Sequence, residues 1–507
     1  MTQTETMLGY LKGRGGTHVA AHRPWPRFEV NEDAWSDIIN RLAVSDWSVV
    51  GLWGETGFVH LALRDEDGGE VAVVSLICRS RRFPSVAAVR PAALRLERAI
   101  QDLHGLVAIG LPDARPWLDH GRWPIAAPLS SAVGEPPPPR PYAFLPVEGE
   151  GVHQIPVGPV HAGIIEPGHF RFHCNGETVV RLEERLGYVH KGVEKLMEGL
   201  SPVQAAKFVA RVSGDSTVAY SLAFARAVEA AAGIEAPPRA AWLRGLMAEL
   251  ERIANHIGDI GAICNDAAFA LMLAHCGALR ERVLRACDHC FGHRLMMDRI
   301  VPGGVAVDLS PEKAGVLWAL VAEVRPAFAR LCEIYDAETS LLDRTVATGV
   351  VGSHLVHRLG AGGVIGRASS RDLDARLSPS YPPYDDLEFE VPVSATGDVN
   401  ARVWGRMHEV TASLGLVENI LERLPSGPDS VEVPPQAGEG MALVEGFRGE
   451  ILVWVRLLPD GRVARCHPRD PSWFQWPLLE VAIEGNIVAD FPLCNKSFNC
   501  SYSGHDL

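Results

Sequence analysis

Arg211-Val-Ser-Gly-Asp-Ser-Thr217 and Asn495-Lys-Ser-Phe-Asn-Cys500 are the two most informative segments of this 507-residue chain. Each segment carries a pair of small polar residues three positions apart. A serine hydroxyl is a hard donor that stays protonated near neutral pH, so it cannot replace a thiolate as the ligand of a soft metal. A single thiol is too few for such a site, and we interpret Cys500 as a small buried hydrophobe. The four positions are Ser213, Ser216, Ser497 and Cys500.

Both segments resemble the metal-binding motifs of nickel–iron hydrogenase large subunits. In that family the first segment reads Arg-Val-Cys-Gly-x-Cys and the second reads Asp-Pro-Cys-x-x-Cys, and the four thiolates hold nickel and bridge it to iron. Three of these four positions are serines here. The resemblance therefore implies a metalloenzyme scaffold without its ligands. We expect this chain to bind no nickel–iron centre and no other cofactor, and we expect an iron–sulfur cluster in a partner subunit.

Further landmarks of the hydrogenases, and of the related 49-kDa subunit of respiratory complex I, follow in the family's order along residues 158–507. Glu183–Lys195 is similar to the "GYxHRGxEK" signature, and Glu249–His256 resembles the "ELxRIxNH" helix. The nearest resemblance is to hydrogenase-4-type and hydrogenase-related large subunits, whose members often lack the metal cysteines. The other landmarks are His161–Arg171, Pro302–Asp308, Gly366–Ser369 and Tyr384–Pro392.

An uninterrupted tetraproline, Pro136–Pro139, separates two differently patterned halves of the chain. Such a run is stiff and extended and cannot continue a helix or a central strand. We therefore predict an α+β fold with a small N-terminal α+β domain over 1–130 and a proline-rich linker over 131–157. A mainly helical bundle of the hydrogenase large-subunit type is predicted over 158–507. The alternative is a surface loop inside a single domain.

The first half has helix-like patterns over 32–43 and 91–103. It resembles the 30-kDa subunit of complex I through Phe83–Ser85, Ala93–Leu103 and Leu111–Arg115. No set of residues in this half suggests chemistry, so we expect a docking role. The β-rich runs that predict strands are 47–52, 58–63 and 70–78.

After residue 200 apolar residues recur at helical spacing, which predicts a helical bundle with small β portions near 155–185 and 445–465. In the resembling family the C-terminal tail returns to the core beside the first motif. Phe498 and Tyr502 keep this path apolar, so we expect a buried tail. With no nickel to load, we also expect no C-terminal processing and a chain that ends at Leu507. The predicted helices are 203–233, 237–262, 267–297, 311–335 and 400–424.

Four polar residues are candidates for a proton-handling cavity. In hydrogenases the segment related to Glu166–His169 supplies a glutamate that relays protons, and in complex I the related loop carries a histidine at the quinone headgroup. A carboxylate and imidazoles in one cavity can move protons without a metal. The alternative for the loop residues is a solvated polar loop, and for Asp215 it is a helix N-cap, which we prefer. The four candidates are His161, Glu166, His169 and Asp215.

Arg367, Asp374 and Arg376 match family positions near the former metal cavity and are candidates for binding an anionic cofactor or ligand. A structural ion network is the more common use of such charges, and we prefer it. The tyrosine that complex I uses at its quinone has no counterpart near Gly214. This absence puts quinone reduction in doubt and leaves a quinone as one further candidate ligand.

Cys287 and Cys290, followed by His293, have the spacing of zinc ligands. They lie inside a long helical pattern, and no second Cys-x-x-Cys pair completes a set of four ligands. We interpret them as buried thiols and a histidine on the helix surface.

The composition excludes several classes of function. The longest helical segments are interrupted by charged residues, so none is expected to span a membrane. The N-terminus has no basic region followed by an apolar run, so no signal peptide is expected. A net charge of −14 argues against nucleic acid as a partner. Ten cysteines form no disulfide-like framework, which fits a reducing cytoplasm.

The resemblance, together with the serines at the ligand positions, implies a subunit of a membrane-associated, complex I-like oxidoreductase that is related to group 4 hydrogenases and lacks the nickel–iron site. Redox or conformational change in its cavity would be coupled to ion translocation. The expected partners are a small iron–sulfur subunit and integral membrane ion-translocating subunits, which would hold the chain at the cytoplasmic face of the cell membrane. The alternatives are an active nickel–iron hydrogenase or formate hydrogenlyase large subunit, and a non-catalytic structural adaptor.

Overall fold

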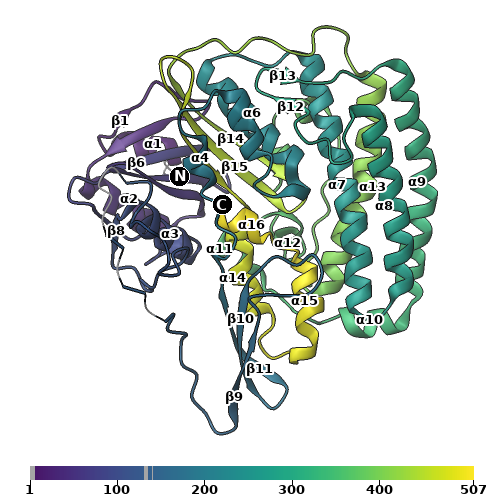
Figure 1. Ribbon diagram of the computed structural model, residues 1–507, viewed down its shortest axis with the longest axis horizontal. Coiled ribbons are helices and arrows are strands. Elements are labelled where there is room, and N and C mark those ends of the chain that lie inside the picture. Colours follow the sequence, from purple (N-terminus) through teal and green to yellow (C-terminus); the bar gives the residue numbers. More distant parts are fainter. Residues whose placement is uncertain (1–5, 131–134, 137, 140) are drawn as a thin grey trace, which may run out of the picture.

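The computed structural model describes residues 6–130, 135–136, 138–139 and 141–507. It is a mixed α/β protein, and this coarse prediction of the fold class is confirmed. In Figure 1 the N-terminal elements lie at the left, two long strands cross the middle, and long helices stand side by side at the right. Within the described ranges, no helix is both long enough and apolar enough to cross a membrane.

The N-terminal sheet has five strands in the order β1-β3-β6-β5-β4. The three predicted strands are found as β4 (Trp47–Glu55), β5 (Phe58–Asp65) and β6 (Val71–Ile77), and each is antiparallel to the next. The two predicted helices are found as α2 (Glu32–Val44) and α3 (Leu94–His104). The other elements of this part are α1 (Met7–Gly13), β1 (Thr17–His18), β3 (Arg27–Val30), β7 (Arg82–Pro84), η1 (Pro91–Ala93) and β8 (Val107–Ile109).

A three-stranded antiparallel sheet extends from the lower part of the molecule (Figure 1). Its strands are β9 (Val152–Val157), β10 (His169–Asn175) and β11 (Thr178–Arg185), with β10 in the centre. The β portion predicted near 155–185 is thereby confirmed. The loop between β9 and β10 holds His161 and Glu166, and His169 is the first residue of β10.

Long helices form the right side of the molecule. Helices α7 (Pro238–Asp266), α8 (Ala270–Phe291), α9 (Pro311–Ala337) and α13 (Val399–Arg423) stand side by side in Figure 1 and share one hydrophobic cluster. The smaller elements of this half of the chain are α4 (Val193–Met197), β12 (Ile300–Val301), β13 (Gly304–Val305), α10 (Thr339–Thr345), α11 (Ser353–Leu359), α12 (Gly363–Arg367), η3 (Arg376–Ser380) and η4 (Tyr384–Asp386).

The predicted continuous helix over 203–233 is wrong. The chain forms α5 (Pro202–Val209) and α6 (Thr217–Ala232), and the first motif lies between them. Its residues Gly214–Ser216 form a short 3-10 turn (η2). The apolar periodicity continues on both sides of the motif, so periodicity alone could not locate the break.

A four-stranded sheet joins the two halves of the chain. Its order is β16-β15-β14-β2, and the N-terminal strand β2 (His22–Arg23) is parallel to β14 (Gly438–Gly446). The strands predicted near 445–465 are found as the hairpin of β14 and β15 (Gly449–Leu457), followed by β16 (Val463–Arg469). Trp53 of β4 also packs on Trp454 of β15, with ring centroids 5.7 Å apart. Separate folding of residues 1–130 stays a prediction.

The C-terminal tail is buried, as predicted. Phe491, Phe498 and Tyr502 lie within the hydrophobic cluster that also contains the N-terminal sheet. The Leu507 carbonyl accepts hydrogen bonds from the backbone N–H groups of Lys191 (2.7 Å) and Gly192 (3.0 Å). The tail elements are α14 (Ser472–Ala482), η5 (Val488–Asp490), α15 (Phe491–Phe498) and α16 (Tyr502–Asp506).

Candidate functional site

The two segments that resemble metal-binding motifs lie against each other. Ser213 Oγ is 2.9 Å from the Oγ of Ser501, the residue that follows the second segment. Arg448, in the turn between β14 and β15, donates from Nε to the Asn499 carbonyl at 2.6 Å. The prediction that the tail packs beside the first motif is confirmed by these contacts.

Both positions of the second motif are buried and have partners within the protein. Ser497 Oγ donates to the Cys494 carbonyl at 2.6 Å and accepts from Arg402 Nε at 2.9 Å. Cys500 Sγ lies 4.0 Å from the Gln475 side-chain oxygen. Burial raises the pKa of the Cys500 thiol well above its ordinary value, so the group stays protonated near neutral pH.

An arginine is paired with the first motif. Arg448 Nη1 and Nη2 donate to the Asp215 carboxylate at 2.7 and 2.6 Å, and Nη1 also donates to Ser216 Oγ at 3.1 Å. Ser213 Oγ donates to the same carboxylate at 2.9 Å. Burial alone would raise the pKa of Asp215, but the charge and hydrogen bonds of Arg448 outweigh it and lower this pKa to about 2. Asp215 is therefore ionised at neutral pH.

The preferred interpretation of Asp215 as a helix N-cap is wrong. Its carboxylate is held by Arg448, and the residue before α6 makes no side-chain cap hydrogen bond. The start of α6 is capped from α7, because the Glu251 carboxyl accepts from Val218 N at 2.7 Å and from Ala219 N at 3.1 Å. A carboxyl group from a neighbouring helix thus satisfies the free N–H groups that a local cap would otherwise serve.

Glu251 and Asp215 line a small hollow between α7 and α8. Burial raises the pKa of Glu251 to about 8, against the lowering effect of the two backbone N–H groups that it accepts from. Asn255 Nδ2 donates to the Asp215 carbonyl at 2.7 Å on the same side. The hollow measures about 10 Å³, which is the space of a single water molecule. A carboxyl with a raised pKa and one with a lowered pKa thus line one small hollow.

The three candidates of the β9–β10 loop are held by local contacts. His161 Nε2 donates to the Gly168 carbonyl at 2.7 Å, and His169 Nδ1 lies 3.3 Å from the Gly158 carbonyl. Glu166 accepts from the backbone N–H of Ser503 at 3.0 Å, which ties the loop to the tail. Among the described residues no hydrogen bond joins any of the three to Asp215. The four predicted residues therefore do not form one hydrogen-bonded cluster.

Arg367, Asp374 and Arg376 come together in the core. Arg367 pairs with Glu409 at 2.6 Å, with Glu445 at 2.9 Å and with Asp374 at 3.3 Å. Arg376 pairs with Asp374 at 2.8 Å. These guanidinium groups are engaged by carboxylates of the protein, as is typical of a structural ion network. Their predicted role toward an anionic cofactor stays untested.

Cys287, Cys290 and His293 make contacts that a metal ligand set would not. His293 Nδ1 accepts from Leu295 N at 3.1 Å and from Met297 N at 3.2 Å. Burial raises the pKa of the Cys290 thiol to about 11 and raises that of Cys287 further. Over the part of the chain that the structure describes, no group of three or more His, Cys, Asp and Glu side chains has the arrangement of a metal site.

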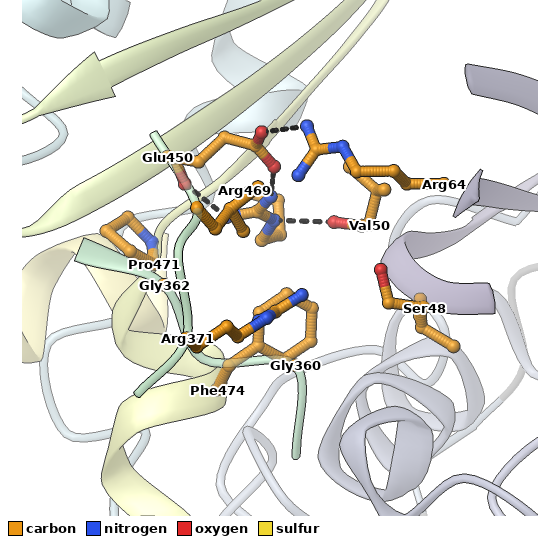
Figure 2. Close-up of a pocket in the computed structure, with 12 residues that line it drawn as sticks. Ser48, Val50, Arg64, Gly360, Gly362, Arg371, Glu450, Arg469, Pro471 and Phe474 are labelled. Atoms are coloured by element: carbon orange, nitrogen blue, oxygen red, sulfur yellow. Dashed lines mark hydrogen bonds and ion pairs between the residues drawn. The ribbon is translucent and has the colours of Figure 1, made fainter. Parts of the chain in front are cut away.

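Figure 2 shows a second cluster, where the N-terminal sheet meets the β15–β16 ladder. Arg64 of β5 pairs with the Glu450 carboxylate, and Arg469 donates to the same carboxylate at 3.0 Å and to the Val50 carbonyl at 2.8 Å. Arg371 lines the opposite wall, where Nη2 donates to Glu66 at 2.6 Å. The cavity among them measures about 10 Å³ and has no room for a substrate. The cluster joins the two halves of the chain.

Two residues of the motif region, Arg448 and Glu251, were not predicted. Glu251 lies inside the quoted "ELxRIxNH" helix, but its contact with the start of α6 depends on how two helices pack. Arg448 follows Phe447 in the turn of an apolar hairpin, and its partner Asp215 is 233 positions away. The glycines at 446 and 449 mark the turn in the sequence, but nothing local marks the pairing.

Comparison with known families matches three stretches of the chain. Residues 38–135 match the family described as the 30 Kd subunit of the respiratory-chain NADH dehydrogenase. Residues 266–436 match the 49 Kd subunit of the same enzyme, and residues 191–258 match nickel-dependent hydrogenase.

Whole proteins give the same result. The chain is 32% identical to Hydrogenase-4 component G of Escherichia coli over 439 residues. This alignment covers 84% of this chain and 76% of that protein. It is 30% identical to the Membrane-bound hydrogenase subunit alpha of Pyrococcus furiosus, over 68% of this chain and 85% of the relative. It is 28% identical to the NADH-quinone oxidoreductase C/D protein of Phocaeicola vulgatus, over 82% and 85%. The chain therefore belongs to the family that unites hydrogenase-4-type large subunits with complex I subunits, and it carries the 30-kDa and 49-kDa modules fused in one polypeptide.

Proposed function

We propose that this chain is a subunit of a membrane-associated, complex I-like oxidoreductase that lacks the nickel–iron site and couples redox or conformational change to ion translocation. It binds no cofactor itself, and an iron–sulfur cluster resides in a small partner subunit. Integral membrane ion-translocating subunits hold it at the cytoplasmic face of the membrane. The name Membrane-bound hydrogenase subunit alpha of one relative supports the membrane association.

The observation that carries this proposal is the pairing of Arg448 with the first motif. A nickel–iron centre needs four thiolates, whereas three positions here are serines and the fourth is a thiol that burial keeps protonated. The guanidinium of Arg448 bonds Ser216 and Asp215 and touches the second motif at Asn499. The Asp215 carboxylate is engaged by Arg448, so it does not stand free as a replacement metal ligand. These residues do not fit a nickel–iron centre.

The same contacts support conformational coupling. Arg448 belongs to the β14–β15 hairpin, Asp215 precedes α6, and Asn499 belongs to the tail. The guanidinium of this hairpin residue bonds both other elements. A displacement of the tail is therefore transmitted to the start of α6. Glu166 adds a fourth connection, since it binds the tail at Ser503 from the β9–β10 loop.

We further propose the arrangement that the sequence predicted: a 30-kDa-like domain over 1–130, a linker over 131–157 and a 49-kDa-like domain over 158–507. The last residues of the predicted linker, Val152–Val157, form β9 and pair with β10, so they belong to the sheet of the second domain. The family matches over 38–135, 191–258 and 266–436 support this order of modules. The N-terminal module contributes docking surface and no chemistry.

Purification of the intact assembly from its natural membranes tests the proposal. We expect membrane subunits and an iron–sulfur subunit to co-purify, with no stoichiometric nickel by elemental analysis and no hydrogen uptake. Proteoliposomes that contain the assembly should move ions when an electron donor and acceptor are supplied. Stoichiometric nickel or hydrogen uptake would show that the chain is the large subunit of an active hydrogenase. A nickel-free assembly without electron transfer or ion movement would make it a structural adaptor.

A further inference from the structure

A large groove lies away from the motif region, between the second half of α6, the start of α7 and the segment around β2. It measures about 560 Å³, which is within the range of small-molecule sites. A second hollow of about 410 Å³ continues from it and shares Arg23, Gly233 and Ile234. The connected hollows therefore have room for an elongated ligand.

Arg226 is the main polar group on the wall of this groove. Its Nε is shut off from solvent without an acceptor, and neither Nη atom hydrogen-bonds to another described residue. The guanidinium lies over the ring of Tyr381, 4.7 Å from its centroid, which fixes its plane. Burial lowers the pKa of Arg226, yet an arginine keeps its charge at any physiological pH. Because Nε is shut off, the part of this unpaired cation that a ligand in the groove can reach is the pair of Nη atoms.

The neighbouring Arg244 shows what a satisfied arginine looks like here. Its Nη atoms donate to Glu229 at 3.0 and 2.5 Å, and its remaining donors reach the carbonyls of Gly304 and Val301. Glu229 is therefore already paired, although its charge still acts on Arg226. Unlike Arg244, Arg226 makes no side-chain hydrogen bond or ion pair with the described part of the protein.

Arg23 provides a second cation at the junction of the two hollows. Its side chain forms no hydrogen bond or ion pair with the described residues, and the guanidinium lies close against Gly233 at the end of α6. The charged side chains on the groove are Arg23, Arg226 and Arg244 against Glu229 and Glu235, which leaves one positive charge in excess.

Apolar side chains also line the groove, among them the exposed Pro24 and Pro382 and the half-buried Ile234. A purely inorganic anion would leave this surface uncovered, and a purely apolar ligand would leave Arg226 unpaired. We propose that the groove binds an amphiphilic organic anion, with its carboxylate or phosphate on Arg226 and Arg23 and its apolar body against Pro24, Ile234 and Pro382.

Titration calorimetry on the purified full chain tests this site with four probes: decanoate, decyl phosphate, decanol and inorganic phosphate. Decanoate and decyl phosphate are expected to bind at least tenfold more tightly than decanol or inorganic phosphate. Only these two probes carry both an anionic group for the arginines and an apolar chain for the apolar side chains of the groove. Vesicles of dioleoylphosphatidylglycerol identify the source of the anion. Binding to them assigns a membrane lipid, and binding of the dissolved anions alone assigns a soluble metabolite.

Arg226→Gln is expected to weaken decanoate binding at least tenfold through loss of a charge-assisted hydrogen bond. Arg423→Gln is the matched control, because Arg423 also stacks on an aromatic ring, that of Trp242, but lies outside the groove. Arg23→Gln removes the second cation without touching the Tyr381 stack, and it should also weaken binding. Equal binding of decanoate and decanol would overturn the proposal, as would unchanged binding in both Arg226→Gln and Arg23→Gln.

Discussion

The guanidinium of Arg448 and the carboxylate of Asp215 form a two-point ion pair, with N–O distances of 2.7 and 2.6 Å, between the β14–β15 hairpin and the first motif. Where the family's motif has thiolates, this chain has serines that hydrogen-bond the same ion pair. The pair thus gives the serines partners and fixes the hairpin against the start of α6. Arg448 also bonds the Asn499 carbonyl, so the hairpin, the first motif and the tail are all connected through its guanidinium.

Asp215→Asn is expected to destabilise the fold by about 2–3 kcal/mol, because it leaves the buried guanidinium of Arg448 without a carboxylate. A fully buried pair would cost more, but the Asp215 side chain is 37% exposed and solvent screens part of the loss. Urea unfolding of both proteins measures the difference. The control is Asp460→Asn, which removes an exposed pair with Arg462 and should leave the stability unchanged. Equal effects of the two substitutions would contradict this account.

Truncation after Asp490 is expected to destabilise the protein by about 5 kcal/mol or more. The deletion removes Phe491, Phe498 and Tyr502, and burial of each large side chain contributes about 1.5–3 kcal/mol. Thermal melting checks this. Phe498→Ala alone should cost about 3–5 kcal/mol, because its side chain is 1% exposed. Ile487→Ala, on a 39% exposed side chain just before the tail, is the control and should change stability by less than about 0.5 kcal/mol. An unchanged melting temperature after truncation would refute the buried tail.

Glu194 makes the stability of the fold depend on pH. Its carboxylate pairs with Arg465 at 2.9 Å and with His467 at 2.6 Å, and all three side chains are buried. Burial alone would raise the pKa of Glu194, but Arg465 and His467 lower it well below the ordinary value of 4.5. Because the folded-state pKa is the lower one, this carboxylate stabilises the fold above pH 4.5, and the contribution is lost as the pH falls below that value.

Glu194→Gln is therefore expected to cost about 3–5 kcal/mol at pH 7. The difference from the unmodified protein should shrink by about 1 kcal/mol at pH 4 and further below it. Denaturant unfolding at several pH values measures both effects. Glu198→Gln, which removes the surface ion pair with Lys195, serves as the control. It should show neither a large loss of stability at pH 7 nor a change of that loss with pH. A difference that stays constant from pH 7 to pH 4 would show that Glu194 is not the group responsible.

The sequence predicts those features that rest on local patterns. The β-rich runs of β4, β5 and β6 are visible in the composition of the segments, and the apolar path of Phe498 and Tyr502 into the core follows from the resemblance. Features that depend on distant partners were missed. Strand β2 has two residues, too few for a period, and exists because β14 pairs with it. Asp215 was assigned to a cap because its real partner, Arg448, comes from a hairpin 233 positions away.

Limited proteolysis is expected to cut first between residues 125 and 157, because the tetraproline cannot belong to a helix or a central strand. Leading cuts within 30–120 would show that the predicted boundary is misplaced. The two fragments should co-elute on a sizing column under native conditions. This expectation rests on three contacts across the boundary: β2 with β14, Arg64 with Glu450, and Trp53 with Trp454.

Trp53→Ala is the variant that tests this last contact. The Trp53 side chain is 1% exposed and packs on Trp454 and His467, so its loss should cost about 3–5 kcal/mol at the interface and release the fragments after cleavage. Trp318→Ala is the matched control, because Trp318 lies on α9 and is 40% exposed. Fragments of the Trp318 variant should co-elute like those of the unmodified chain. If the cleaved Trp53 variant also co-elutes, the strand pairing and the ion pair are sufficient to hold the halves together, and the aromatic contact is not the main source of their association.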